Sequence, residues 1–313
     1  MKRLFALGWL LLGVSVCLGL AALSARAAEA EGLRLVPYPK RVTLAEGTFD
    51  LQRPLVLERT GGADDNEVLL IAAELQRAGL PAPKPSTTQP PAATDTFWLR
   101  LAIHPGTALP TRQFRDGAGA EDYQLRVERD AITCCGRGPA GLFCAVQTLC
   151  QLIRANRDGT QLPCLTVEDW PALQWRCAQD DLTRGPSSTL ATLQRGIELG
   201  ASLKLNMFTY YMEYQYAFAK HPEIGPRDGS LEPAELQALV SAAKKQHTEV
   251  LGNQQSFGHF DWILRKPQYA ALGENRGVLC PVKEETYQLL DDMYSEVCPR
   301  LPFEMFNVCC DET

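Results

Sequence analysis

The spacing of apolar and polar residues changes near residue 170, which divides the chain into two parts. Before that point, short apolar or alternating runs predict strands, and apolar residues at helical spacing predict two helices. We therefore expect a small α+β domain over residues 31–168. The predicted strands cover 51–57, 97–103 and 123–127, and the predicted helices cover 65–80 and the turns after Gly138-Pro139.

From residue 169 onward, predicted strands and helices alternate, which is typical of parallel βα units. Polar residues gather where each strand ends, and no Gly-x-Gly-x-x-Gly turn follows a strand, which removes the usual nucleotide-binding interpretation. Four units fit a doubly wound sheet or half of an eight-stranded barrel, and the polar strand ends favour the barrel. The predicted strands cover 173–178, 203–210, 248–254 and 304–310, with helices around 190–197, 236–243 and 290–297.

The expected fold class is thus α/β, with the α+β domain followed by the first half of a TIM (β/α)8 barrel. A barrel of this kind takes roughly 250 residues, whereas the sequence reaches Thr313 directly after the fourth strand. We expect residues 169–313 to be the first four βα units of a truncated barrel, and the chain to be inactive by itself.

The first residues have the order of a secretory signal. Lys2 and Arg3 precede an apolar run over 4–23, and Ala25-Arg26-Ala27 follows it. The run is nearly long enough to cross a bilayer, so a membrane anchor is the alternative, but the small residues at its end favour cleavage. We expect a signal peptide at 1–27, a periplasmic or extracellular protein, and no stable membrane insertion after cleavage.

Charge and cysteine content exclude several kinds of partner. The formal net charge is −6 and the basic residues are scattered, so neither nucleic acid nor an anionic membrane is an expected partner. With four histidines and no Cys-x-x-Cys pair, the sequence has no zinc-site spacing, and we predict no metal. Most of the eleven cysteines are expected to be small buried residues, with one or two disulfides whose pairing stays open.

Asp311 and Glu312 directly follow the apolar strand predicted at 304–310. Neighbouring side chains in a strand face opposite ways, but where the strand ends the backbone turns and both carboxyl groups can converge. One carboxylate stays ionised, and its charge together with burial raises the pKa of the other toward that of a general acid. The two residues are therefore the candidate catalytic pair.

Several segments resemble glycoside hydrolase family 20 in their order and spacing along the chain. Each is a short motif, so the resemblance depends on the whole series. The segments are 35–40 with 47–49, 138–143 with 147–152, Asp169-Trp170-Pro171 with Arg176, Asp181 and Arg184, Lys204-Leu205-Asn206, Gly258-His259, and Cys310-Asp311-Glu312.

The resemblance implies retaining exo-hydrolysis of terminal β-linked N-acetylhexosamine residues by substrate-assisted catalysis, without a metal or cofactor. The 2-acetamido oxygen of the sugar attacks the anomeric carbon. Glu312 protonates the leaving oxygen and later activates water, while Asp311 orients the acetamido group. The expected partners are glycans that contain N-acetylglucosamine or N-acetylgalactosamine.

Two further residues acquire expected roles from the resemblance. Arg176, expected at the end of the first barrel strand, would hydrogen-bond sugar hydroxyls, with a salt bridge to Asp180 or Asp181 as the alternative. His259 would hold the acid or line the pocket, with a purely structural histidine as the alternative.

The sequence also departs from the pattern of the family. The places of its usual His-x-x-Asp hold Tyr211 and Tyr214, and Glu213 beside them either replaces the missing aspartate or faces solvent. Asn307 and Phe257 stand where a histidine and a proline are usual. A noncatalytic carbohydrate-binding protein and a family 84-like acetamido-sugar hydrolase therefore stay as alternatives, although the adjacent Asp-Glu speaks against the second.

Overall fold

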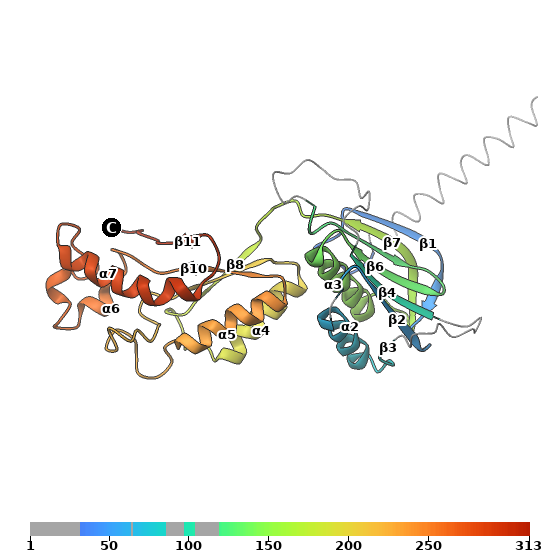
Figure 1. The fold of residues 1–313 in the computed structure, drawn as a ribbon, viewed down its shortest axis with the longest axis horizontal. Coiled ribbons are helices and arrows are strands. Elements are labelled where there is room, and N and C mark those ends of the chain that lie inside the picture. Colours follow the sequence, from blue (N-terminus) through green and yellow to red (C-terminus); the bar gives the residue numbers. More distant parts are fainter. Residues whose placement is uncertain (1–31, 64, 86–96, 104–118) are drawn as a thin grey trace, which may run out of the picture. The chain divides into compact units, whose positions relative to one another are not determined.

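The computed structural model describes residues 32–63, 65–85, 97–103 and 119–313. The chain divides into two compact units, Met1–Ala172 and Leu173–Thr313 (Figure 1). The signal peptide predicted at 1–27 lies outside the described residues. No helix in the described part of the chain is long and apolar enough to cross a membrane.

The described part of the N-terminal unit is a seven-stranded mixed sheet with two helices. Its strands are β1 (Arg41–Asp50), β2 (Leu55–Thr60), β3 (Lys84–Pro85), β4 (Phe97–Ile103), β5 (Tyr123–Val127), β6 (Ala131–Gly136) and β7 (Gln161–Asp169), and its helices are α2 (Asp65–Arg77) and α3 (Pro139–Ala155). The strand order is β1-β7-β5-β6-β4-β2-β3. Helix α3 packs on β4, β5 and β6, and α2 packs on α3 (Figure 1).

Helix α3 is the centre of this unit because it is apolar on nearly every side. Pro139 lies in its first turn, where the missing N–H is not needed, and every residue from Gly141 to Ile153 is buried. Burial of a leucine side chain contributes about 1.5–3 kcal/mol. The Tyr123 phenol on β5 donates to Asp169 Oδ2 at 3.0 Å and lies 2.7 Å from the Thr148 hydroxyl on α3. Hydrophobic burial therefore holds the helix, and this hydrogen-bonded group joins it to two strands.

The predictions for β4, β5, α2 and α3 are confirmed, whereas β1, β3, β6 and β7 were not predicted. The pairing of β1 with β7 has an irregularity between Leu44 and Thr48, and most of β1 is exposed, so alternation of apolar residues does not reveal it. The strand predicted at 51–57 begins at Leu55, because the residues before it form the turn after β1.

The described part of the C-terminal unit contains a four-stranded sheet in which every pair of neighbours is parallel and the strands follow chain order. The strands are β8 (Cys177–Asp181), β9 (Met207–Tyr211), β10 (Glu249–Asn253) and β11 (Phe306–Asn307), and the helices are α4 (Leu190–Ser202), α5 (Pro233–Lys245), α6 (Asp261–Leu264) and α7 (Glu284–Val297). The predicted alternation of strands and helices is confirmed, and the fold class is α/β.

The two faces of this sheet differ in polarity. Phe208 has Ala178 and Val250 as its register partners, so these apolar side chains share one face. Gly200 of α4 lies so close to Phe208 that an added Cβ would be 2.4 Å from a ring carbon, which shows that α4 packs on this face. Asn253, on the opposite face, donates through Nδ2 to Gln179 Oε1 at 3.2 Å. One face is therefore core, and the other carries polar groups.

The outer strands of the sheet are shorter than predicted. β8 begins at Cys177, because the apolar Leu173 and Trp175 that indicated an earlier start are exposed and precede the pairing with β9. β11 contains only Phe306–Asn307, because Cys309 (φ 58°) and Cys310 (φ 70°) have a left-handed backbone that a strand cannot contain.

All ten described cysteines are free thiols, so the disulfides considered from the sequence are not formed among them. Cys134, Cys135, Cys144, Cys150 and Cys164 are buried. Burial raises the pKa of Cys150 to about 12, which leaves its thiol protonated and unreactive. No cluster of His, Cys, Asp and Glu within the described ranges has an arrangement that could hold a metal ion.

We predict that Tyr123→Phe lowers the free energy of unfolding of the N-terminal unit by about 1–3 kcal/mol, because it leaves a buried carboxylate and a buried hydroxyl short of a partner. Urea denaturation of the chain, followed by circular dichroism, measures the change. Tyr38→Phe is the control, since Tyr38 is 43% exposed and water can replace any lost partner. Equal effects of the two changes would contradict the role given to Tyr123.

Candidate active site

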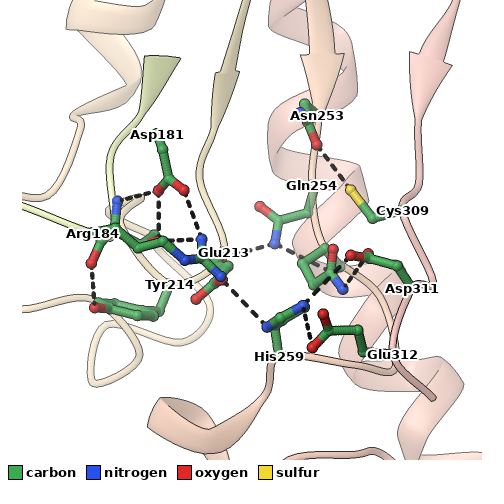
Figure 2. A network of polar contacts seen from close by, with 12 residues as sticks. Asp181, Arg184, Glu213, Tyr214, Asn253, Gln254, His259, Cys309, Asp311 and Glu312 are labelled. Atoms are coloured by element: carbon green, nitrogen blue, oxygen red, sulfur yellow. Dashed lines mark hydrogen bonds and ion pairs between the residues drawn. The ribbon is translucent and has the colours of Figure 1, made fainter. Parts of the chain in front are cut away.

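Four of the five predicted site residues lie together at the carboxyl ends of the parallel strands. Glu213 follows β9, His259 follows β10, and Asp311 and Glu312 follow β11. Figure 2 shows His259 between Glu213 on one side and the Asp311–Glu312 pair on the other. The parallel strands therefore join residues that are about one hundred positions apart in the sequence.

His259 is the centre of this group. Its Nε2 lies 3.5 Å from Asp311 Oδ2 and 3.5 Å from Glu312 Oε2, and its Nδ1 lies 4.0 Å from Glu213 Oε1. The imidazole is mostly buried, with 21% of its side chain exposed. A histidine with carboxylates at both ring nitrogens is held in orientation and can carry a proton between them. The arrangement speaks against the alternative of a histidine that only ties down its own loop.

The two carboxyl groups of the candidate pair differ in their hydrogen bonds and in their exposure to solvent. Gln255 donates through Nε2 to Asp311 Oδ1 at 2.9 Å, and this hydrogen bond, with a smaller contribution from His259, holds the pKa of Asp311 below its usual value. Asp311 is therefore the member that stays ionised. The side chain of Glu312 is 76% exposed, so the burial that we expected around the acid is not provided by the described residues.

Glu213 has the most unusual environment of the three acids. Only 8% of the residue is exposed, so the alternative in which it faces solvent is wrong. Burial raises its pKa, while the Tyr211 hydroxyl, Arg184 and His259 act in the opposite direction. Arg184 Nη2 lies 3.2 Å from Glu213 Oε1. A buried carboxylate with a cation in contact is a frequent component of functional sites.

The backbone around the group is strained. Among the described non-glycine residues, most of those with positive φ belong to the site or adjoin it, and such conformations persist only where the surrounding structure imposes them. They are Glu213 (φ 42°), Phe257 (φ 63°), His259 (φ 55°), Cys309 (φ 58°), Cys310 (φ 70°) and Glu312 (φ 57°).

Arg176 does not join this group. It precedes β8, so the expectation that it lies at the carboxyl end of the first strand is wrong. Its guanidinium donates to the backbone carbonyls of Lys204 and Leu173, at 2.7 and 2.8 Å. These contacts hold the segment that leads into β8. The salt bridge of Asp181 is formed with Arg184 and not with Arg176.

Sequence reasoning assigned no role to two contributors. Arg184 was noted only as part of a motif, because its ion pair with Asp181 is formed in an irregular segment where sequence spacing does not indicate a contact. Gln255 is completely buried. In the sequence, only its position directly after the predicted apolar strand indicated that its amide could be a partner for a carboxylate.

A hollow of about 250 Å³ opens beside the group. Arg184, Glu213 and His259 contribute to its wall together with Tyr214 and Trp262. The rings of Tyr214 and Trp262 are stacked, with centroids 4.9 Å apart and planes at 21°. Charged groups next to an aromatic surface suit a ligand that has both hydroxyls and an apolar face.

Comparison with known proteins agrees with the motifs. Residues 32–170 match the family model described as glycosyl hydrolase family 20, domain 2. These residues are therefore similar to domain 2 of family 20. A β-hexosaminidase of Porphyromonas gingivalis is 23% identical over 96% of this chain, which covers 42% of that relative. The resemblance inferred from the sequence motifs is thereby confirmed.

Solved family 20 structures have the same fold. A chitobiase of Flavobacterium johnsoniae aligns with 89% of this chain and 44% of its own, at 19% identity and a TM-score of 0.69. A β-N-acetylhexosaminidase of Streptomyces coelicolor aligns with 88% of this chain and 59% of its own, at 21% identity and a TM-score of 0.67. The chain thus spans about half the length of the relatives it matches.

We predict that Gln255→Leu raises the pKa of Asp311, because the change removes the donor that favours the charged form. A pH titration of the chain with ¹³C-labelled aspartate, followed by NMR, measures the midpoint directly. Gln237→Leu, at an exposed position of α5, is the control and should leave the Asp311 signal unchanged. An unshifted midpoint in Gln255→Leu would mean that another group keeps Asp311 ionised.

Proposed function

We propose that the full-length protein is a retaining exo-β-N-acetylhexosaminidase that uses substrate-assisted catalysis. The observation that carries the proposal is the Asp311–Glu312 pair after β11, with His259 Nε2 at 3.5 Å from both carboxylates. The family 20 domain in residues 32–170 and the fold shared with hexosaminidases and a chitobiase support it.

We also propose that the four βα units are the first half of a (β/α)8 barrel. The strands are parallel and follow chain order, helices alternate with them, and the polar residues gather at their carboxyl ends. A barrel requires each of these features, and its active site lies at that end of the strands. In a complete barrel, further loops would surround Glu312, whose side chain is largely exposed in this chain.

In the first step of the proposed reaction, the acetamido oxygen of the bound sugar forms a bond to the anomeric carbon. The bond from that carbon to the leaving oxygen breaks, and Glu312 donates its proton to the leaving oxygen. Asp311, held ionised by Gln255, accepts a hydrogen bond from the acetamido N–H and stabilises the positive charge of the oxazolinium ion. This mechanism differs from that of most glycosidases, which use a carboxylate as the nucleophile.

In the second step, the Glu312 carboxylate takes a proton from water while the water oxygen attacks the anomeric carbon. The oxazolinium ring opens, and the sugar leaves with the same configuration that it had in the substrate. The Nε2 atom of His259 faces both carboxylates and helps to fix their orientation. Its Nδ1 atom faces Glu213. Arg176 has no part in this scheme, because it precedes β8 and its guanidinium binds the backbone carbonyls of Lys204 and Leu173.

The proposed substrates are neutral glycans that end in β-linked N-acetylglucosamine or N-acetylgalactosamine. The net charge of −6 agrees with a neutral partner, and the hollow beside the site combines hydroxyl-binding groups with an aromatic surface. The signal-like first 27 residues support export to the periplasm or the medium.

Glu312→Gln in the full-length protein should lower kcat for disaccharide substrates by about 10²–10⁴-fold, because an amide cannot donate the proton. Aryl glycosides with good leaving groups should lose much less, since they need little protonation. Steady-state kinetics with both substrates measures the difference. Glu304→Gln, an exposed glutamate just before β11, is the matched control. An equal loss for both substrates would show that Glu312 is not the general acid.

Asp311→Asn should also lower kcat for both substrate types by about 10²-fold or more, because the amide cannot balance the positive charge of the oxazolinium ion. A thiazoline analogue of this ion should inhibit the unchanged enzyme and bind more weakly to the variant. Inhibition kinetics measures both effects. Isolation of a covalent sugar ester on a protein carboxylate would overturn the substrate-assisted mechanism.

A further inference from the structure

Arg184 joins two strands of the sheet through their acidic residues. It lies in the segment between β8 and α4, with Nη1 at 2.7 Å from Asp181 Oδ2 and Nη2 at 3.2 Å from Glu213 Oε1. Its guanidinium carbon lies 5.1 Å from the centroid of the Tyr211 ring, which fixes the plane of the fork. The two contacts are thus made by different nitrogens of one rigid group, as Figure 2 shows.

Glu213 requires this contact more than Asp181 does. Asp181 has 31% of its side chain exposed and accepts a hydrogen bond from the Thr183 hydroxyl at 2.7 Å, whereas Glu213 has only 10% of its side chain exposed. An ionised carboxylate that is removed from water needs a cation or hydrogen-bond donors in compensation. Arg184 is the cation in direct contact with it at 3.2 Å, since His259 is 4.0 Å away.

The groups around Glu213 come from every neighbouring strand. The Tyr211 hydroxyl and Asp181 face it from β9 and β8, and Asp181 raises its pKa. The Cys309 thiol, beyond β11, interacts with it electrostatically from the far side. Among these groups only Arg184 and His259 favour the charged form by their charge.

His259 extends the effect to the carboxylate pair. A charged Glu213 attracts the Nδ1 side of the ring, which faces it at 4.0 Å, while Nε2 faces Asp311 and Glu312 at 3.5 Å. A neutral Glu213 would give the ring no such preference. The charge of Glu213 therefore helps to hold the imidazole in its orientation toward the pair.

We propose that Arg184 is a positioning residue, whose guanidinium holds the Glu213 carboxylate charged against His259 and so maintains the imidazole between Glu213 and the Asp311–Glu312 pair. As a reaction step this rests on the proposed hexosaminidase function, but the electrostatic link itself does not. Arg184 does not touch the reacting atoms in this scheme and acts through two other side chains.

Loss of the Arg184 charge should change how the activity depends on pH. Arg184 lowers the pKa of Glu213, so its replacement by a neutral residue raises that pKa. Glu213 then takes up a proton at a higher pH, and activity that depends on its charge is lost sooner as the pH falls. The acidic limb of the kcat/KM profile should therefore move to higher pH.

The experiment compares Arg184→Gln, Arg184→Lys and Arg195→Gln in the full-length protein. Profiles of kcat/KM against pH, measured with an aryl N-acetylglucosaminide, should show the upward shift in Arg184→Gln. Arg184→Lys keeps the charge but loses the fork, so its acidic limb should stay near that of the unchanged protein while kcat falls. Arg195, exposed on α4, controls for the loss of one positive charge. A lower rate with an unchanged profile in Arg184→Gln would reduce Arg184 to a structural role and overturn the inference.

A second measurement does not depend on activity. NMR titration of ¹³C-labelled glutamate, with the Glu213 signal assigned from Glu213→Gln, should show a higher midpoint for Glu213 in Arg184→Gln. If no N-acetylhexosaminide is hydrolysed but this midpoint rises, the proposed function fails and the electrostatic role of Arg184 stands. If the midpoint is unchanged, the inference about Arg184 fails whatever the activity.

Discussion

The parallel direction of β8, β9, β10 and β11 is the constraint on which the site depends. Because all four strands run the same way, the segments that follow them emerge at one edge of the sheet. Glu213, His259 and the Asp311–Glu312 pair each follow a different strand, so no local motif could bring them together. The helices that return the chain pack on the apolar face, where Gly200 lies against Phe208, and leave the polar groups to the other face and to the strand ends.

Differences in burial give the three acids of the site different properties. Asp311 is exposed but receives an amide hydrogen bond from Gln255, which favours its charged form. Glu213 is buried, which disfavours its charge, and the ion pair with Arg184 offsets that effect. Glu312 faces open space next to His259. A site that needs one acid to donate a proton and others to remain charged is built by such unequal environments.

The sequence predicted what depends on local pattern and missed what depends on pairing. Helices such as α3 and strands such as β4 have apolar spacing that is visible in the sequence, and they were placed well. Strand β1 is mostly exposed and is defined by its partner β7, so its pattern carried no signal. The catalytic candidates follow apolar strands and were found from position and motif. The position of Arg176 was predicted wrongly because the apolar Leu173 and Trp175 indicated a strand, although both are exposed and precede it. The predicted strand therefore began and ended too early.

The departures from the family pattern that follow or end β9 form one consistent arrangement in space. Tyr214, at the place of the usual aspartate, turns its ring onto Trp262 instead of supplying a carboxylate. Glu213, at the preceding position, has a left-handed φ of 42°, and its Oε1 lies 4.0 Å from His259 Nδ1. Tyr211, at the place of the usual histidine, contributes its hydroxyl to Glu213 and its ring to Arg184. Glutamate is longer than aspartate, and Glu213 is buried one position before Tyr214, so its charge needs a cation nearby. Arg184 is in position to provide that cation. Separate substitutions in the sequence are therefore linked by a single electrostatic requirement, the charge on Glu213.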